Sequence, residues 1–220
     1  MERIKEMRDI AIYGAGGFGR EIACLLNRIN KVEPTWNLLG FFDDNVEMGK
    51  MISHFGPCIG NIDDLNDYEK ELAVIISISQ PDIIKSIVKK TYNDNIWFPN
   101  IVHPDFIISD LESFSIGKGN IIQGGCSVSC NVIFGDFNVF NGAVVFGHDD
   151  IIGSFNSFMP AVRVSGEVKI GDCNFFGVGS IVLQQLQVGN NVRLGAGSVM
   201  MIKPKDGCVY IGNPAKKFSF

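Results

Sequence analysis

Three histidines, the side chains that titrate near neutral pH, occur in the 220 residues, at His54, His103 and His148. Only His148 is followed directly by two carboxylates, Asp149 and Asp150. A carboxylate beside an imidazole fixes its tautomer and raises its basicity. We therefore predict that His148 is a general base, able to take a proton from an attacking amine or hydroxyl. The sequence leaves open which aspartate is its partner.

A second group of residues suited to ligand binding is the glycine-rich stretch from Gly14 to Gly19, which includes Gly16, Gly17 and Phe18. It follows an apolar run and opens a helical pattern, an arrangement in which backbone N–H groups and the helix dipole hold a phosphate or pyrophosphate. Asp43 and Asp44 close the next predicted strand, where a carboxylate binds a ribose hydroxyl. NAD and a nucleotide-sugar both fit this pattern, and so does a tight turn without a ligand.

The residues around His148 belong to a six-residue repeat. Every sixth position from Ile116 to Met200, fifteen in all, carries a large apolar residue. With a hydrophobic content of 46%, such a run arises by chance on the order of 5 times in 100,000. A six-residue repeat is typical of a parallel β-helix, in which short strands of successive coils pair about 4.8 Å apart and the repeated apolar residue points inward.

Three hexads make one coil of eighteen residues, because two further residue types recur at that spacing. The glycines of this series are Gly117, Gly135, Gly153, Gly171 and Gly189, and the asparagines are Asn120, Asn138, Asn156 and Asn174. We expect the glycines to adopt unusual backbone angles at a corner. We expect the asparagines to stack into a ladder. Residues 116 to 199 would give about 4.7 coils without an insertion.

We number each hexad from its repeated apolar residue, which is position one. On such a β-helix His148 takes the third position, two residues after the inward Phe146, and should face outward. The residue one coil further on is Gly166. A glycine there leaves space for a substrate and offers a backbone N–H that could stabilise an oxyanion. Asp150 occupies the fifth hexad position, where we expect partial burial and therefore a partner.

The first hundred residues alternate between strand and helix, which implies a parallel sheet of Rossmann type. The predicted strands are 9–13, 38–42, 72–79 and about 96–101, and the predicted helices begin after Gly16 and span 81–91. Four strands are fewer than a full dinucleotide fold has, so a half unit that holds one nucleotide is favoured over NAD. We expect a Rossmann-like nucleotide-sugar-binding domain over 1–104 and a β-helix domain with a C-terminal tail over 105–220.

The composition argues against several partners. A net charge of −5 provides no global attraction to nucleic acid or an anionic membrane. No apolar run approaches the ~18 residues of a membrane span, and the charged segment Met1–Asp9 lacks a signal-peptide core. We expect a cytoplasmic protein. The six cysteines form no CxxC pair, so we expect reduced packing residues and no metal.

Motifs along nearly the whole chain resemble those of left-handed β-helix acyltransferases of the NeuD and PglD type, which are sialic acid O-acetyltransferases and UDP-4-amino-sugar acetyltransferases. The carriers of this resemblance are residues 13–19 (YGAGGFG), 40–44 (GFFDD), His103-Pro104, 147–149 (GHD), Ser165-Gly166 and 212–216 (GNPAK).

The resemblance implies a homotrimer in which acetyl-CoA lies between adjacent β-helices and a nucleotide-sugar reaches in from the Rossmann-like domain. It implies that His148 is the base and that Asp149 tunes it. The matching acetyl-CoA contacts are Asn156, Gly166, Val178 and Ala196, and the matching nucleotide contacts are Gly16, Gly17, Phe18, Asp43 and Asp44.

The expected function is therefore N-acetylation of a UDP- or dTDP-linked 4-amino-4,6-dideoxy sugar. O-acetylation of sialic acid or another sugar is the main alternative, and a non-catalytic nucleotide-binding trimer is an alternative of another class. A γ-carbonic anhydrase would need three zinc-binding histidines, whereas the repeats contain one. An ice-binding β-helix would present ranks of threonine, which the repeats lack.

Overall fold

A computed structural model describes residues 7–218 of the chain. Residues 1–6, part of the charged segment Met1–Asp9, lie outside this range. The chain forms two compact units, one up to Pro104 except for residues 80–82, and the other from Asp105 onward.

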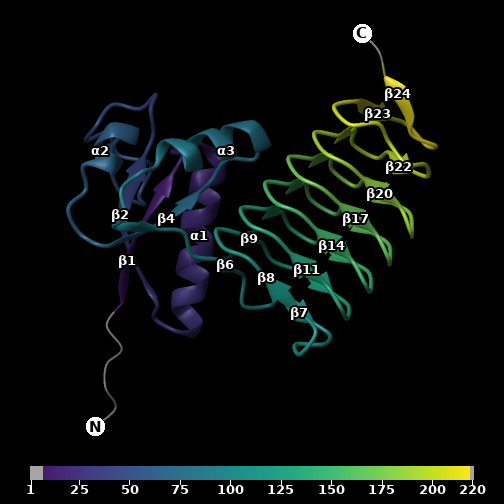
Figure 1. Cartoon of the computed structure of the whole chain (residues 1–220). Coiled ribbons are helices and arrows are strands. Elements are labelled where there is room, and N and C mark those ends of the chain that lie inside the picture. The colour runs from purple at the N-terminus through teal and green to yellow at the C-terminus, as the bar shows by residue number, and fades with distance from the viewer. Residues whose placement is uncertain (1–6, 219–220) are drawn as a thin grey trace. The chain divides into compact units, whose positions relative to one another are not determined.

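The N-terminal unit is built on a parallel sheet with the strand order β3-β2-β1-β4-β5. Its strands are β1 (Arg8–Tyr13), β2 (Trp36–Phe42), β3 (Cys58–Gly60), β4 (Leu72–Ile76) and β5 (Ile96–Trp97). The helices are α1 (Gly17–Val32), α2 (Ile62–Asn66) and α3 (Pro81–Lys90). Figure 1 shows β1, β2 and β4 side by side. Central strand β1 is buried over its last four residues, as expected for a parallel sheet covered on both faces.

Most predicted elements of this unit are confirmed, with three differences. The strand predicted over 72–79 ends at Ile76. β3 and α2 were not predicted, because three and five residues are too few to show a periodicity. The strand predicted near 96–101 is two short strands, β5 and β6 (Ile101–Val102). Pro99 lies between them and has no N–H to donate to a strand ladder.

The C-terminal unit is a parallel β-helix with three faces (Figure 1). The first face contains β7 (Ile107–Ile108), β10 (Ser127–Val128), β13 (Val145–Phe146), β16 (Arg163–Val164), β19 (Ile181–Val182) and β22 (Val199–Met200). The second contains β8 (Ser115–Ile116), β11 (Ile133–Phe134), β14 (Ile151–Ile152), β17 (Lys169–Ile170) and β20 (Gln187–Val188). The third contains β9 (Ile121–Ile122), β12 (Val139–Phe140), β15 (Ser157–Phe158), β18 (Phe175–Phe176), β21 (Arg193–Leu194), β23 (Val209–Ile211) and β24 (Lys216–Phe218).

The repeated apolar residues form the core of this unit, as predicted. From Ile122 to Met200 every one of them is buried, and only Ile116, in the first coil, is partly exposed. Phe158 stacks on Phe176 with ring centroids 4.6 Å apart, and Phe140 stacks on Phe158 at 5.3 Å. Each buried phenylalanine contributes roughly 1.5–3 kcal/mol of hydrophobic free energy. The predicted fold class, an α/β Rossmann-like unit followed by an all-β parallel β-helix, is confirmed.

The corners correct one expectation about glycine. Positive φ angles occur at the fourth hexad position, for example 61° at Asp149 and 62° at Glu167. The recurring glycines such as Gly135 stand at the second position and have no positive φ. A Cβ atom at Gly135 would lie 2.7 Å from the carbonyl oxygen of Gly153 in the next coil. These glycines are therefore required by the close stacking of coils.

Candidate active site

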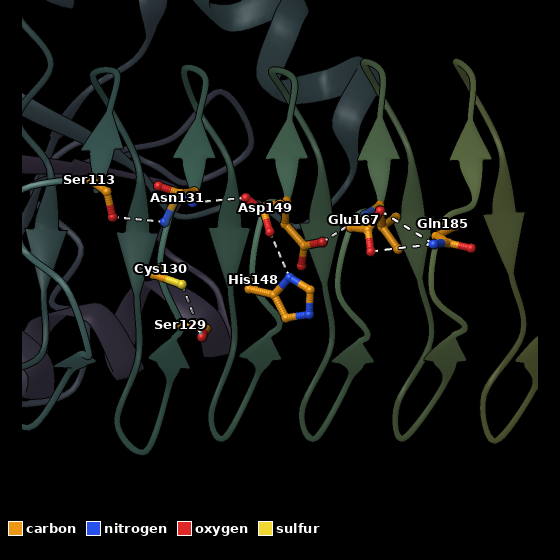
Figure 2. A network of polar contacts seen from close by, with 10 residues as sticks. Ser113, Ser129, Cys130, Asn131, His148, Asp149, Glu167 and Gln185 are labelled. Carbon is orange, nitrogen blue, oxygen red and sulfur yellow. Dashed lines mark hydrogen bonds and ion pairs between the residues drawn. The ribbon is translucent and has the colours of Figure 1, made fainter.

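His148 lies in a corner between the first and second faces, directly after β13 (Figure 2). Its Nδ1 is 2.7 Å from Oδ2 of Asp149, and the two side chains are 55% and 47% exposed. Because the carboxylate is an acceptor, Nδ1 carries the proton and donates it. The free lone pair is then on Nε2, which is the atom available to act as a base.

A chain of polar side chains on successive coils orients Asp149 (Figure 2). Asn131 donates its Nδ2–H to Oδ1 of Asp149 over 2.9 Å, and the Asn131 N–H is donated to Oγ of Ser113 over 2.8 Å. Sequence reasoning missed Asn131 and Ser113. Steps of 18 residues back from Asp149 lead to both, and steps forward lead to Glu167 and Gln185.

The two members of the pair shift each other's pKa in opposite directions. The hydrogen bond to Asp149 raises the pKa of the His148 imidazole above its ordinary value, and the charges of Asp149, Glu167 and Asp150 add to this. The hydrogen bond from His148 lowers the pKa of Asp149, and the bond from Asn131 lowers it further. The carboxylate therefore stays ionised while the imidazole changes its protonation state.

Gly166 lies against the His148 ring. A Cβ atom at Gly166 would be 2.6 Å from Nε2, so the ring occupies the space that a side chain would take. The prediction that this space is left for a substrate needs correction, since the imidazole fills part of it. The Gly166 N–H makes no hydrogen bond among the described residues, whereas its carbonyl accepts the N–H of Gln185.

Asp150 differs from Asp149 in its surroundings. It is 0% exposed and points into the β-helix, where its Oδ1 accepts the Val168 N–H over 2.8 Å. The residue that contacts the imidazole is therefore Asp149. The predicted burial of Asp150 is confirmed and is complete.

Three of the four acetyl-CoA contacts implied by the resemblance lie at two different corners. Gly166 belongs to the His148 corner, whereas Val178 and Ala196 follow third-face strands β18 and β21. Val178 is 52% exposed. Together with Met159, Phe175, Gly177, Arg193, Leu194, Gly195 and Val209, the pair lines a largely apolar hollow of about 360 Å³.

Asn156 is not on the surface, which corrects its expected role as a cofactor contact. It is 0% exposed. Its Nδ2 donates to Oδ1 of Asn138 over 3.1 Å and to the Gly171 carbonyl over 2.9 Å, and its Oδ1 accepts the Asn174 N–H. The side chain is thus consumed by the predicted asparagine ladder, which is confirmed, and cannot reach a ligand.

The glycine-rich loop leaves room for a ligand at the start of α1. A Cβ atom at Gly19 would lie 2.0 Å from the Gly14 carbonyl oxygen, so the turn requires glycine there. Gly16 has nothing within 4 Å of such an atom, and Gly17 has only a flexible arginine end at 3.9 Å. No side chain caps the helix, and its first turn contains no acidic residue. The exposed N–H groups of Gly17 and Phe18 therefore suit an anion.

Asp43 and Asp44 differ in how far the protein itself uses them. Asp43 accepts the Ala15 N–H on one oxygen and the Asn45 N–H on the other, each within 2.9 Å. Asp44 Oδ1 accepts the Tyr13 hydroxyl over 2.7 Å and the Ile62 N–H over 3.1 Å. Burial and the bond to Asp44 raise the pKa of Tyr13 well above its ordinary value, so the phenol remains a donor. Asp43 fixes the loop, and Asp44 keeps an oxygen for a ligand.

Other kinds of site were sought in residues 7–218. Burial raises the pKa of the Cys126 thiol to about 11, which makes it a poor nucleophile. Within that range no cluster of three or more His, Cys, Asp or Glu side chains is arranged to hold a metal ion. None of the helices in the same range combines the length and apolar character needed to cross a bilayer.

Comparisons with known proteins agree with this fold. Residues 9–91 match the model of the PglD N-terminal domain. The acetyltransferase domain of PglB from Neisseria gonorrhoeae, solved with acetyl coenzyme A, is 28% identical, with a TM-score of 0.86 over 97% of this chain and 100% of that one. No curated protein sequence matches significantly.

Two more distant structures share the fold. PerB from Caulobacter crescentus, solved with CoA and GDP-perosamine, is 22% identical, with a TM-score of 0.81 over 97% of this chain and 99% of that one. WeeI from Acinetobacter baumannii is 23% identical, with a TM-score of 0.84 over 97% of this chain and 100% of that one. The predicted resemblance to left-handed β-helix acetyltransferases of the NeuD and PglD type is therefore confirmed.

Proposed function

We propose that this chain is an acetyl-CoA-dependent N-acetyltransferase that acts in the cytoplasm on a UDP- or dTDP-linked 4-amino-4,6-dideoxy sugar during surface polysaccharide or glycan biosynthesis. The observation that carries this proposal is the His148–Asp149 hydrogen bond of 2.7 Å, which leaves Nε2 free as a base next to Gly166. The proposed substrate has two parts. The N-terminal unit suits its nucleotide, and His148 suits its amine.

In the proposed reaction Nε2 of His148 takes a proton from the sugar amine as the nitrogen attacks the thioester carbonyl. The new C–N bond forms, the C–S bond breaks, and CoA leaves as a thiolate. The free Gly166 N–H is the donor proposed for the oxyanion. Asp149 stabilises the imidazolium that forms, as its bond to Nδ1 allows.

We also propose that the active form is a homotrimer. His148 and Gly166 lie at one corner of the coil, and Val178 and Ala196 lie at another. One cofactor that contacts both sets is accommodated when adjacent copies bring different corners together. Gly166, Val178 and Ala196 are retained as the proposed acetyl-CoA contacts, and Gly16, Gly17, Phe18 and Asp44 as the proposed nucleotide contacts, with Asp43 holding their loop.

The test is a thiol-release assay with acetyl-CoA and a panel of acceptors. Turnover with a UDP- or dTDP-4-amino-4,6-dideoxyhexose is expected. Turnover with sialic acid and none of the amino sugars would favour O-acetylation, for which the same base would deprotonate a hydroxyl. Nucleotide-sugar binding without release of CoA from any acceptor would favour a non-catalytic nucleotide-binding trimer.

A further inference from the structure

Asp150 is a buried carboxyl group at a place where the β-helix otherwise has apolar side chains. It occupies the fifth hexad position at the His148 corner and is 0% exposed. The residues at the same position in the neighbouring coils are Val132 and Val168, which are also 0% exposed. A carboxyl group in such surroundings needs hydrogen-bonding partners for both of its oxygens.

The asparagines at the corner between the second and third faces show which hydrogen bonds a polar side chain at the fifth hexad position makes. Oδ1 of Asn138 accepts the backbone N–H of Asn156, 18 residues on, over 2.9 Å. Its Nδ2 donates to the carbonyl of Gly153, 15 residues on, over 2.9 Å. The side chain therefore clamps both ends of the turn in the following coil. The same two bonds recur at Asn120, Asn156 and Asn174.

Asp150 makes the first of these bonds and lacks the second. Its Oδ1 accepts the N–H of Val168, 18 residues on, over 2.8 Å. Its Oδ2 is buried and has no hydrogen-bond partner within residues 7–218. The carbonyl 15 residues on is that of Ser165, which accepts no hydrogen bond among the described residues. Oδ2 of Asp150 and the carbonyl oxygen of Ser165 are both acceptors, so a hydrogen bond between them requires a proton on Oδ2.

We propose that Asp150 is a protonated carboxylic acid that donates Oδ2–H to the Ser165 carbonyl and thereby fixes the turn bearing Gly166, on which the His148 ring rests. Asp150 is thus a positioning residue, and its effect on catalysis rests on the proposed function. The protonated acid would complete the clamp that Asn138 makes with its amide.

The electrostatic surroundings agree with a neutral acid. Burial raises the pKa of Asp150 to about 7, although the N–H groups of Val168 and Gly147 act in the opposite direction. The titratable groups whose charges act on it are His148 and Asp149 in its own coil. At the same corner of the neighbouring coils the titratable residues are Glu167 and Cys130. Ionisation of Asp150 would break the bond to Ser165 and raise the pKa of His148 further.

The protonation state is tested by infrared difference spectroscopy of the wild type against Asp150→Asn. We expect the carbonyl stretch of a protonated carboxylic acid in the wild type, its disappearance as the pH rises through about 7, and its absence in the variant. A wild type without this band, or a variant that keeps it, would overturn the proposal. This experiment does not depend on any enzymatic activity.

The positioning role is tested by comparing Asp150→Asn with Asp150→Val. Asparagine supplies a permanent donor to Ser165, so we expect it to keep most of the rate and the NMR chemical shifts of the His148 ring. Valine, the residue of the neighbouring coils, keeps the packing and removes the clamp. We expect this folded variant to shift the ring signals and lower kcat at least ~10-fold, with little change in KM.

Ring signals of the valine variant that match the wild type would refute the positioning role. If the ring shifts occur and the wild type acetylates none of the acceptors, the clamp stands and the proposed function fails.

Thermal unfolding is a second test of whether Asp150 is protonated. An acid with an unfolded pKa of about 3.9 and a folded pKa of about 7 stabilises the fold most at low pH and loses that contribution as pH rises between the two values. Asp150→Asn should lack this loss.

Discussion

At the residue scale, the proposed chemistry depends on the hydrogen bond between Nδ1–H of His148 and Oδ2 of Asp149. The bond fixes the tautomer and directs the Nε2 lone pair away from the carboxylate. It also raises the pKa of the imidazole above its ordinary value, so the neutral base forms at a higher pH than in an isolated histidine. Activity should therefore rise with pH as His148 loses its proton.

Asp149→Asn tests this at the same scale. Without the carboxylate the pKa of His148 falls, so the acidic limb of the kcat/KM profile should move to lower pH. The plateau should fall at least ~10-fold, because the ring loses its orienting acceptor. Steady-state kinetics across pH measure both effects.

Glu167→Gln is the matched control for this variant. Glu167 occupies the same hexad position one coil on and raises the pKa of His148 through its charge, without a bond to the ring. We expect a smaller shift of the limb and a nearly unchanged plateau. If the acidic limb shifts equally and the kcat/KM plateau is the same in the two variants, the hydrogen bond between His148 and Asp149 contributes no more to catalysis than a nearby charge does.

At the scale of the element, close stacking of two coils holds the imidazole in place. Gly166→Ala would put a Cβ atom 2.6 Å from Nε2, with only ring atoms as its three nearest neighbours. The ring must move, so we expect a loss of about 100-fold in kcat with the fold intact, as measured by kinetics and circular dichroism.

Gly142→Ala is the control. Gly142 has the same hexad position as Gly166 but follows strand β12 of the third face. A Cβ atom there would meet only the Gly124 carbonyl oxygen, at 3.6 Å. This variant should keep the rate. A Gly166→Ala protein with the wild-type rate would contradict the placement of the base.

The asparagine ladder is a second property of the element. Asn156→Ala removes four buried hydrogen-bond partners, and each donor or acceptor left unsatisfied costs about 1–3 kcal/mol. We expect the free energy of unfolding to fall by about 3 kcal/mol or more, with an unchanged KM for acetyl-CoA. Asn191→Gly, at an exposed site whose side chain makes no hydrogen bond in the described part of the chain and whose φ of 57° suits glycine, should change stability far less. A raised KM without destabilisation would restore Asn156 as a cofactor contact.

At the scale of the whole molecule, the sequence predicted what depends on periodicity. The hexads predicted the β-helix and the outward face of His148, because a six-residue period alone determines which side chains enter the core. The 18-residue coil also places Asn131 beside Asp149, but the repeat does not determine which of these exposed side chains form a hydrogen bond across coils. Asn156 fitted both the ladder and a cofactor contact, and only its burial separates the two. The three residues of β3 are too short to carry a pattern.

Assembly makes a further prediction at this scale. In the proposed homotrimer, His148→Ala and Val178→Arg each damage one of the two corners that form the site, so each variant should be inactive alone. Mixed trimers should recover about a quarter of the wild-type activity, because random assembly pairs two intact corners at one interface in four. Co-expression followed by the thiol-release assay measures this. His148→Ala mixed with Gly166→Ala, two changes at one corner, should recover nothing. Failure of the first pair to recover would favour a site within one copy.

The central claim is that His148 is the base for acetyl transfer to a sugar amine. The most direct measurement is the rate at which wild type and His148→Ala convert acetyl-CoA and a UDP- or dTDP-4-amino-4,6-dideoxyhexose to the N-acetyl product and CoA. A general base contributes about 100-fold or more, so we predict a variant at least ~100-fold slower at every pH. Equal rates in the two proteins would contradict the claim.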